Sequence, residues 1–182
     1  MTDRALLRTE PLTARNAGFL RQGAELISRL TPGQYEVTPR HFHRGGVGAH
    51  VRHILDHYDC FLRGVESGRV DYDQRERDLS VATDPVVAAR KLEQVIAALE
   101  RLTESDGSRL LDVAIDRGGE QTDAPHWGVS SVARELQFLV SHTVHHYAVI
   151  AAMLRPQGIE PGSDFGVAPS TLEYEQGVAC VR

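Results

Sequence analysis

The sequence predicts an all-α protein built as a four-helix bundle with long crossover loops. Apolar residues recur at steps of three and four over four separate segments, which is the spacing of one helix face. Three of these segments have about 18 to 20 residues, and the fourth is longer. A chain of 182 residues has the size of one domain, so we expect residues 1–182 to form a single four-helix-bundle domain.

The first two expected helices are residues 12–30 and residues 47–65. The sequence TPG at 31–33 ends the first helix, because proline and glycine interrupt helices. The sequence RGG at 44–46 precedes the second helix. Its apolar stripe consists of Val47, Val51, Ile54, Tyr58, Phe61 and Val65.

The third and fourth expected helices carry clear start signals. Asp84 is the expected N-cap of the third helix, which begins with a proline and spans residues 85–102. The fourth helix is opened by Ser130 or Ser131 and ends before Pro156. It is the longest of the four, near 25 residues.

The connections between these helices are not all short. Residues 31–46 and 68–83 are expected to be long loops. Residues 110–127 are typical of a small β-hairpin that turns at residues 117–119. We expect the tail, residues 156–182, to pack over one end of the bundle, because it contains apolar residues among its glycines and prolines.

Composition and charge exclude several classes of function. The 25 acidic residues outnumber the 20 basic ones, which argues against a nucleic-acid partner. We find neither a signal peptide nor an apolar run long enough for a membrane span, so we expect no membrane association and a cytoplasmic location. Two cysteines do not make a disulfide framework, and no phosphate-binding loop, nucleophile elbow or CxxC motif is present.

Histidines give the strongest indication of chemistry. Nine occur in the chain, and most lie in two short windows. In the fourth expected helix, Leu139, His142, His146 and Val149 follow steps of three, four and three along one face. His142 and His146 therefore lie one above the other on a face expected to be buried, and His145 is one position off it.

The second expected helix carries a matching set, because His50, His53 and His57 line one side. If the two helices face each other, one of these residues meets the pair His142 and His146. Neutral imidazoles that converge in an apolar core can serve as metal ligands, and three protein ligands with an open position are typical of a catalytic metal site. His53 is central, and its two neighbours are expected to orient a ligand or to line the pocket.

Each candidate residue also has an alternative role that involves neither metal binding nor catalysis. A histidine on an apolar helix is often a core residue bonded to a nearby oxygen, and HxxxH alone is weak evidence of a metal. Asp56 and Asp59 are expected to face solvent. Glu135 is either a base or hydrogen-bond acceptor near the site, or a helix-capping or surface residue. His41 and His43 lie in a loop, either exposed or at the mouth of the site.

Two stretches resemble the DinB/YfiT-like superfamily of metal-binding four-helix bundles. VGAHVRHILDHYDCFL is similar to the second helix of that family, whose central histidine falls at His53. SHTVHHYAVIA is similar to its last helix, where the HxxxH pair falls at His142 and His146. VDYDQRERD and DFGVAPSTL resemble one branch of the family, so the likeness covers most of the chain. The extra histidines, His50, His57 and His145, depart from the family pattern.

The resemblance implies a divalent ion on His53, His142 and His146, commonly zinc or nickel and sometimes manganese. Characterised relatives include thiol-dependent S-transferases and a thiol-dependent isomerase that use low-molecular-weight thiols such as bacillithiol or mycothiol. Three imidazoles also suit iron or copper. The family name refers to DNA-damage induction and implies no DNA binding.

We therefore hold two hypotheses about function. In the first, the protein is a metal-dependent enzyme, a transferase or hydrolase acting on a small molecule, in which Tyr147 or His57 orients the substrate. In the second, it is a non-catalytic, stress-related binding or dimerisation bundle with structural histidines. A homodimer is compatible with both, because dimers are common among soluble proteins.

Overall fold

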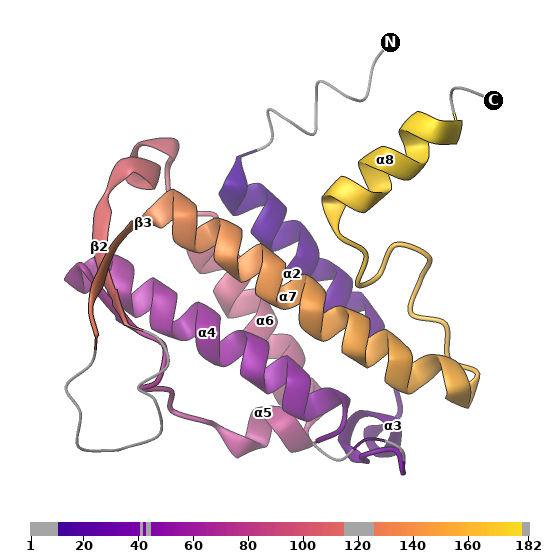
Figure 1. Cartoon of the computed structure of the whole chain (residues 1–182). Coiled ribbons are helices and arrows are strands. Elements are labelled where there is room, and N and C mark those ends of the chain that lie inside the picture. Colours follow the sequence, from indigo (N-terminus) through magenta and orange to yellow (C-terminus); the bar gives the residue numbers. More distant parts are fainter. Residues whose placement is uncertain (1–10, 41, 43–44, 115–125, 180–182) are drawn as a thin grey trace.

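The computed structural model describes residues 11–40, 42, 45–114 and 126–179. Four long helices form a bundle (Figure 1): α2 (Leu12–Ser28), α4 (Val47–Ser67), α6 (Pro85–Leu99) and α7 (Val132–Leu154). Helix α2 packs against α6 and α7, and α4 packs against the same two helices. The predicted four-helix bundle is confirmed, and this arrangement makes α4 and α7 neighbours. Within the described ranges, no helix combines the length and apolar character needed to cross a bilayer.

Helix boundaries follow the predicted start signals closely. Asp84 caps α6, where its carboxylate accepts hydrogen bonds from the backbone N–H groups of Val86 and Val87. Ser131, rather than Ser130, caps α7. Helix α4 is followed by its C-cap Gly68, which has a left-handed φ of +80° that glycine adopts without strain.

Short helices replace parts of the expected loops. The TPG sequence ends α2 and also opens α3 (Pro32–Glu36), because Thr31 and Gln34 form a reciprocal capping box. Helix α5 (Leu79–Thr83) precedes α6. The remaining short elements are the 3₁₀ helices η1 (Glu104–Ser108) and η2 (Arg155–Gln157) and helix α8 (Pro169–Ala179).

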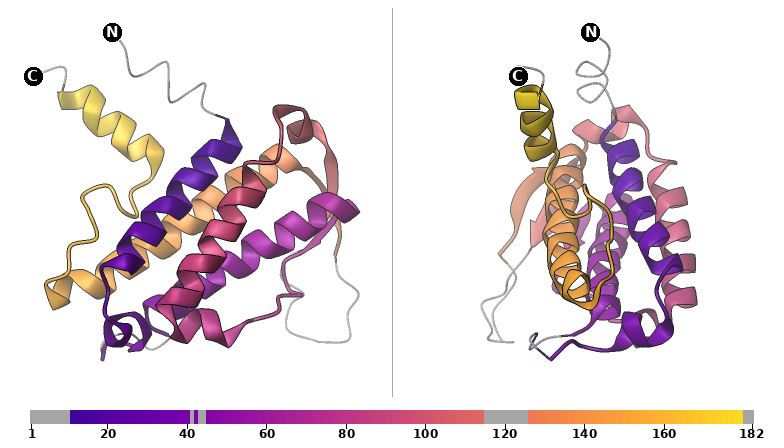
Figure 2. Two further views of the ribbon diagram at one scale, coloured as in Figure 1. Left: turned by 180° about the vertical axis from the view of Figure 1, so that it is seen from behind. Right: turned by 90° about the vertical axis from the view of Figure 1, so that its right-hand side faces the viewer.

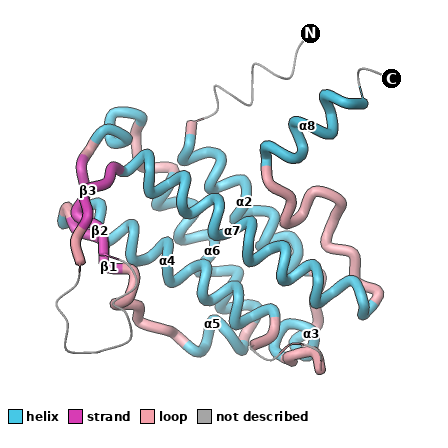
Figure 3. Tube along the Cα trace, in the orientation of Figure 1, coloured by secondary structure: helices cyan, strands magenta, loops and turns pink. Residues whose placement is uncertain are grey.

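A small sheet lies at one end of the bundle (Figure 3), with strand order β1 (Arg69–Asp71), β2 (Leu110–Ala114), β3 (Gly128–Ser131). Strands β2 and β3 are antiparallel, which confirms a small antiparallel pair between α6 and α7. Its second strand begins at Gly128, just after the predicted range of 110–127, and the expected turn at 117–119 lies outside the described residues. Strand β1 pairs with β2 in parallel. It was not predicted, because its three residues become a strand only by pairing with a segment about forty residues away.

The core lies between the four long helices and contains a buried polar network centred on Asn16 and Tyr58. The Asn16 amide donates to the backbone oxygens of Leu12 and Leu136 at 2.7 and 3.1 Å. The Tyr58 hydroxyl donates to the Asn16 side-chain oxygen at 2.7 Å and lies 3.3 Å from the Thr143 hydroxyl. Buried polar groups need such partners, so this network joins α2, α4 and α7.

The tail runs along the side of the bundle, and the expectation that it covers one end is wrong. Phe165 is buried and its ring stacks on that of Tyr147 at a centroid distance of 4.3 Å. The guanidinium of Arg29 donates to the backbone oxygen of Pro161 at 3.1 Å. Most of the described side chains of α8 are exposed, and Figure 2 shows this helix on the outside of the bundle. Its first residues line a pocket together with residues of α2 and α7.

Candidate metal centre

The packing of α4 against α7 brings the predicted histidines together. The ring centroid of His53 lies 5.0 Å from that of His142 and 4.7 Å from that of His146. His142 and His146 are 4.6 Å apart by the same measure. Imidazoles from two distant parts of the chain therefore share one small region, as the spacing of the sequence indicated.

His57 lies within this group, although the sequence predicts only that it orients a ligand or lines the pocket. Its ring centroid is 4.1 Å from that of His142 and 4.5 Å from that of His53. Among the described residues, the group of three whose ligand atoms all lie within 4.8 Å of one another is His53, His57 and His142. Three imidazole nitrogens within this range of one another are candidates for the coordination shell of one metal ion, which they would reach by small rotations of the side chains.

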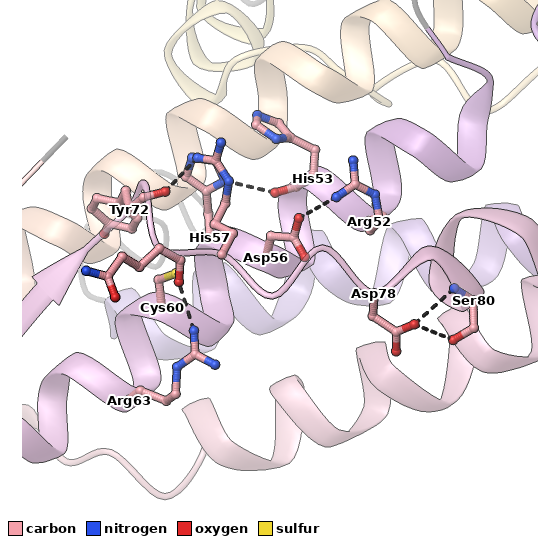
Figure 4. Close-up of polar contacts among 11 residues, drawn as sticks. Arg52, His53, Asp56, His57, Cys60, Arg63, Tyr72, Asp78 and Ser80 are labelled. Carbon is pink, nitrogen blue, oxygen red and sulfur yellow. Dashed lines mark hydrogen bonds and ion pairs between the residues drawn. The ribbon is translucent and has the colours of Figure 1, made fainter. Parts of the chain in front are cut away.

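Two ring nitrogens have the chemistry of metal ligands. The Nδ1 of His57 lies 2.8 Å from the backbone oxygen of His53 (Figure 4), and only a protonated Nδ1 bonds a carbonyl. The lone pair of the neutral ring is then on Nε2. The Nε2 of His142 is buried and has no hydrogen-bond partner within the described part of the chain. An orphaned buried nitrogen costs free energy, and a metal ion would supply its missing partner.

The outer end of the cluster holds the other histidines. The Nδ1 atoms of His50 and His146 lie 2.8 Å apart, so one of the two rings donates to the other. His145 is exposed, and its ring centroid lies 5.1 Å from that of His146. The cluster thus runs from buried His57, which is 3% exposed, to His145 at the surface.

Burial keeps four rings of the cluster neutral, those of His53, His57, His142 and His146. Burial, followed by the effect of neighbouring imidazoles, lowers the pKa of His53 to about 4, of His146 to about 3 and of His142 to about 2. Burial also lowers the pKa of His57. A neutral imidazole carries the lone pair that a metal ion needs, so the cluster is prepared for metal binding at neutral pH.

A wall of buried and partly buried side chains supports the inner end of the cluster. The Tyr72 ring stacks on that of His57 at 5.4 Å and 24°, and Phe138 stacks on His142 at 5.7 Å and 28°. The Tyr72 hydroxyl donates to Glu135 at 2.9 Å, and the Ser130 hydroxyl donates to the same carboxylate at 2.5 Å. Glu135 is therefore a buried acceptor and neither a cap nor a surface residue. Sequence reasoning missed Tyr72, which lies outside the long helices, and Phe138, although its position four residues before His142 places it on the same helix face.

The two aspartates of α4 differ from each other. Asp56 was expected to face solvent, but it is buried and pairs with Arg52 at 2.7 Å, one turn earlier on the helix. Burial raises the pKa of Asp56, and the Arg52 charge opposes this effect. Asp59 is partly exposed and pairs with Lys91 at 2.8 Å. With both carboxylates engaged by cations, the candidate ligands are imidazoles.

The structure places Tyr147 away from the role suggested for it. Its hydroxyl donates to the backbone oxygen of Phe19 on α2 at 2.8 Å, and its ring contacts Phe165 of the tail. It is fully engaged in the core between α2 and α7, so the expectation that Tyr147 orients a substrate is wrong. His41 and His43 lie outside the described residues.

Fold and site together define a class: a helical bundle whose two neighbouring helices present a cluster of neutral histidines able to hold a metal ion. The chain belongs to the DinB family, whose model matches residues 8–176. This confirms the resemblance to the DinB/YfiT-like superfamily.

Two known proteins are similar to this chain. A DinB-like protein, YjoA from Bacillus subtilis, superposes with a TM-score of 0.60 at 19% identity, over 81% of this chain and 92% of that one, which shows a shared fold. FK506-binding protein 5 from Rhizopus delemar is 30% identical over 107 residues. That match covers 58% of this chain and only 27% of the relative, so the chain spans less than a third of that protein.

Proposed function

We propose that the protein is a metal-dependent enzyme whose histidine cluster binds a divalent ion. Zinc and nickel are the first candidates for this ion. The observation that supports this most is the inner group of three imidazoles, in which the buried Nε2 of His142 has no partner among the described residues. His53 and His142 belong both to this group and to the set implied by the family. Manganese, iron and copper are compatible with imidazole ligands as well.

The chemistry of the donor set favours catalysis over a closed structural site. Three protein ligands leave coordination positions for a water or a substrate atom, and a bound divalent ion acts as a Lewis acid that lowers the pKa of such a group. The protein itself would hold the imidazoles neutral, exclude bulk water from the inner end and leave the outer end accessible.

We propose a thiol-dependent S-transferase as the specific activity, on the basis of family membership. In this reaction the sulfur of a low-molecular-weight thiol forms a bond to an electrophilic carbon of a small molecule. The leaving group departs with the electrons of the broken bond, and the thiol proton is released to solvent. A cytoplasmic location is part of this proposal, because thiols stay reduced there.

Chelation tests this proposal against a purely structural role for the cluster. We expect close to one ion per chain by mass spectrometry and loss of the ion in His53→Ala and His142→Ala. Chelated protein should keep its helical circular dichroism, because buried apolar side chains hold the four long helices together. It should lose turnover with a panel of thiols and alkyl or aryl halides. A wild-type protein that binds none of the five metals would overturn the proposal. A large fall in melting temperature without any activity would favour the non-catalytic bundle.

The proposed partners follow from this function. We propose a small-molecule substrate and no nucleic-acid partner, and a homodimer remains a prediction for light scattering to test. Steeply salt-dependent binding to DNA would contradict the expectation that we drew from the net charge.

A further inference from the structure

The deepest histidine of the cluster is also the one held most firmly. His57 is buried and its Nδ1 donates to the backbone oxygen of His53 at 2.8 Å, which fixes the ring and leaves Nε2 as its ligand atom. Metal-binding histidines commonly use one nitrogen in this way, because a carbonyl partner sets the tautomer of the other. The family pattern gives His57 no role.

His146 has a different set of contacts. Its Nδ1 lies 2.8 Å from the Nδ1 of His50, so Nε2 is the nitrogen left for a ligand, as in His57. His146 nevertheless stands outside the group of three described residues whose ligand atoms lie within 4.8 Å of one another. This separation of ligand atoms favours His57 over His146 as the third partner of His53 and His142.

His57 is linked through Tyr72 to the buried carboxylate of Glu135. Tyr72 covers one face of the imidazole, and its hydroxyl donates to the Glu135 carboxylate, which also accepts a bond from Ser130. Tyr72 is 1% exposed and Glu135 is 6% exposed, so these bonds are screened little by water. Tyr72 follows β1 and Ser130 lies on β3, so the small sheet brings both to α7.

We propose that the divalent ion is bound at the inner end of the cluster by His53, His57 and His142, and that Tyr72 and Glu135 are positioning residues that hold the His57 ring. This proposal rests on the proposed function, because it assumes that the cluster binds a metal. The ion would then lie deeper in the protein than an ion bound by His53, His142 and His146. His146 would lie on the side of the ion that is open to substrate.

Metal affinity of single variants tests which histidine is the third ligand. The dissociation constant for zinc or cobalt(II), measured by competition with a chromogenic chelator, should rise on the order of 100-fold or more in His57→Ala and less than about 10-fold in His146→Ala. The absorption spectrum of bound cobalt(II) should change in the first variant, and His57→Gln keeps the test possible if the alanine variant does not fold. The reverse order of effects, or equal losses, would overturn the inner site while leaving the proposed function intact. Absence of binding by the wild type would defeat the proposed function itself.

The positioning role needs a matched control. Tyr72→Phe removes the hydroxyl bond to Glu135 and should weaken metal binding about 10-fold, with a shifted cobalt(II) spectrum. Glu135→Ala should weaken metal binding in the same way. Glu135→Gln should keep most of the affinity, because its side-chain oxygen still accepts the bond from Tyr72. Tyr35→Phe is the control, because Tyr35 is also buried and its hydroxyl also donates one bond, to the backbone oxygen of Val81 at 2.7 Å. If Tyr72→Phe changes only the melting temperature, as Tyr35→Phe should, then Tyr72 is merely structural.

Discussion

His142 shows how its surroundings prepare one side chain for chemistry. Burial, together with the neighbouring His57 and His146 rings, lowers its pKa to about 2. The ring is thus neutral at every physiological pH, while its buried Nε2 has no partner in the described part of the chain. A side chain in this state is poorly satisfied in the metal-free protein, so metal binding and folding stability are linked.

The lowered pKa values predict that the metal-free protein loses stability in mild acid. The pKa values of His53, His142 and His146 in the folded state lie below the usual 6.5, so the unfolded chain takes up protons first as the pH falls. Stability is then fully present above about pH 6.5 and decreases below it, by up to about 1.4 kcal/mol per pH unit for each extra proton bound.

Urea unfolding in the presence of a chelator at pH 7.5, 6.5 and 5.5 measures this slope. We expect a shallower slope in His142→Leu, which removes one titrating ring. A free energy of unfolding that stays constant across this range would show that the rings are not kept neutral by the fold.

At the scale of elements, glycines on α4 allow its neighbours to approach closely. A Cβ atom at Gly64 would lie 2.3 Å from the Val70 Cγ2 atom and 2.7 Å from the Arg69 backbone oxygen, both on β1. At Gly48 it would lie 2.0 Å from the backbone oxygen of Ala82 on α5. Gly64 therefore sets how closely the sheet packs on α4, and Gly48 sets how closely α5 packs on it. Because Tyr72 directly follows β1, the contact at Gly64 also positions Tyr72.

Gly64→Ala should destabilise the protein by about 1–3 kcal/mol, because backbone atoms of β1 cannot move aside without disturbing the sheet. Gly18→Ala in α2 is the matched control: within the described residues a Cβ added there would meet open space, so the change should stabilise the helix by about 0.5–1 kcal/mol. Thermal or chemical unfolding of both variants measures the difference. Equal effects would mean that β1 does not pack on α4 as described.

At the scale of the whole molecule, the order of the four long helices decides the site. Helices α4 and α7 are neighbours, and both also pack against elements that carry no histidine of the cluster. The sheet closes one end of the bundle. There, Glu135 of α7 accepts hydrogen bonds from Tyr72, which follows β1, and from Ser130 of β3. The candidate metal centre is thus a product of the topology rather than of any single element.

The tail gives a test at this scale. Phe165→Ala should cost about 3–5 kcal/mol, because the buried ring stacks on Tyr147 and its removal leaves a cavity against α7. Removal of residues 169–182 should cost far less, since most of α8 is exposed. Denaturant unfolding compares the two changes. A truncation as harmful as Phe165→Ala would show that α8 contributes to the core.

The sequence by itself determined the four long helices, the N-cap of α6, the choice of Ser130 or Ser131 for α7, and the two sets of histidines. Periodicity and capping are local properties, since a helix face and the bonds of Asp84 or Ser131 involve residues only a few positions apart. The same local rule placed His53, His142 and His146 on faces that were able to meet.

Only the tertiary structure decided what surrounds those histidines. Strand β1, the stacking of Tyr72 on His57 and the burial of Glu135 and Asp56 depend on contacts between segments far apart in the chain. Helical spacing states which side a residue faces, but not which neighbour it meets or how deeply it is buried. For this reason the sequence predicted only that His57 orients a ligand or substrate or lines the pocket, whereas in the fold it stands at the inner end of the cluster.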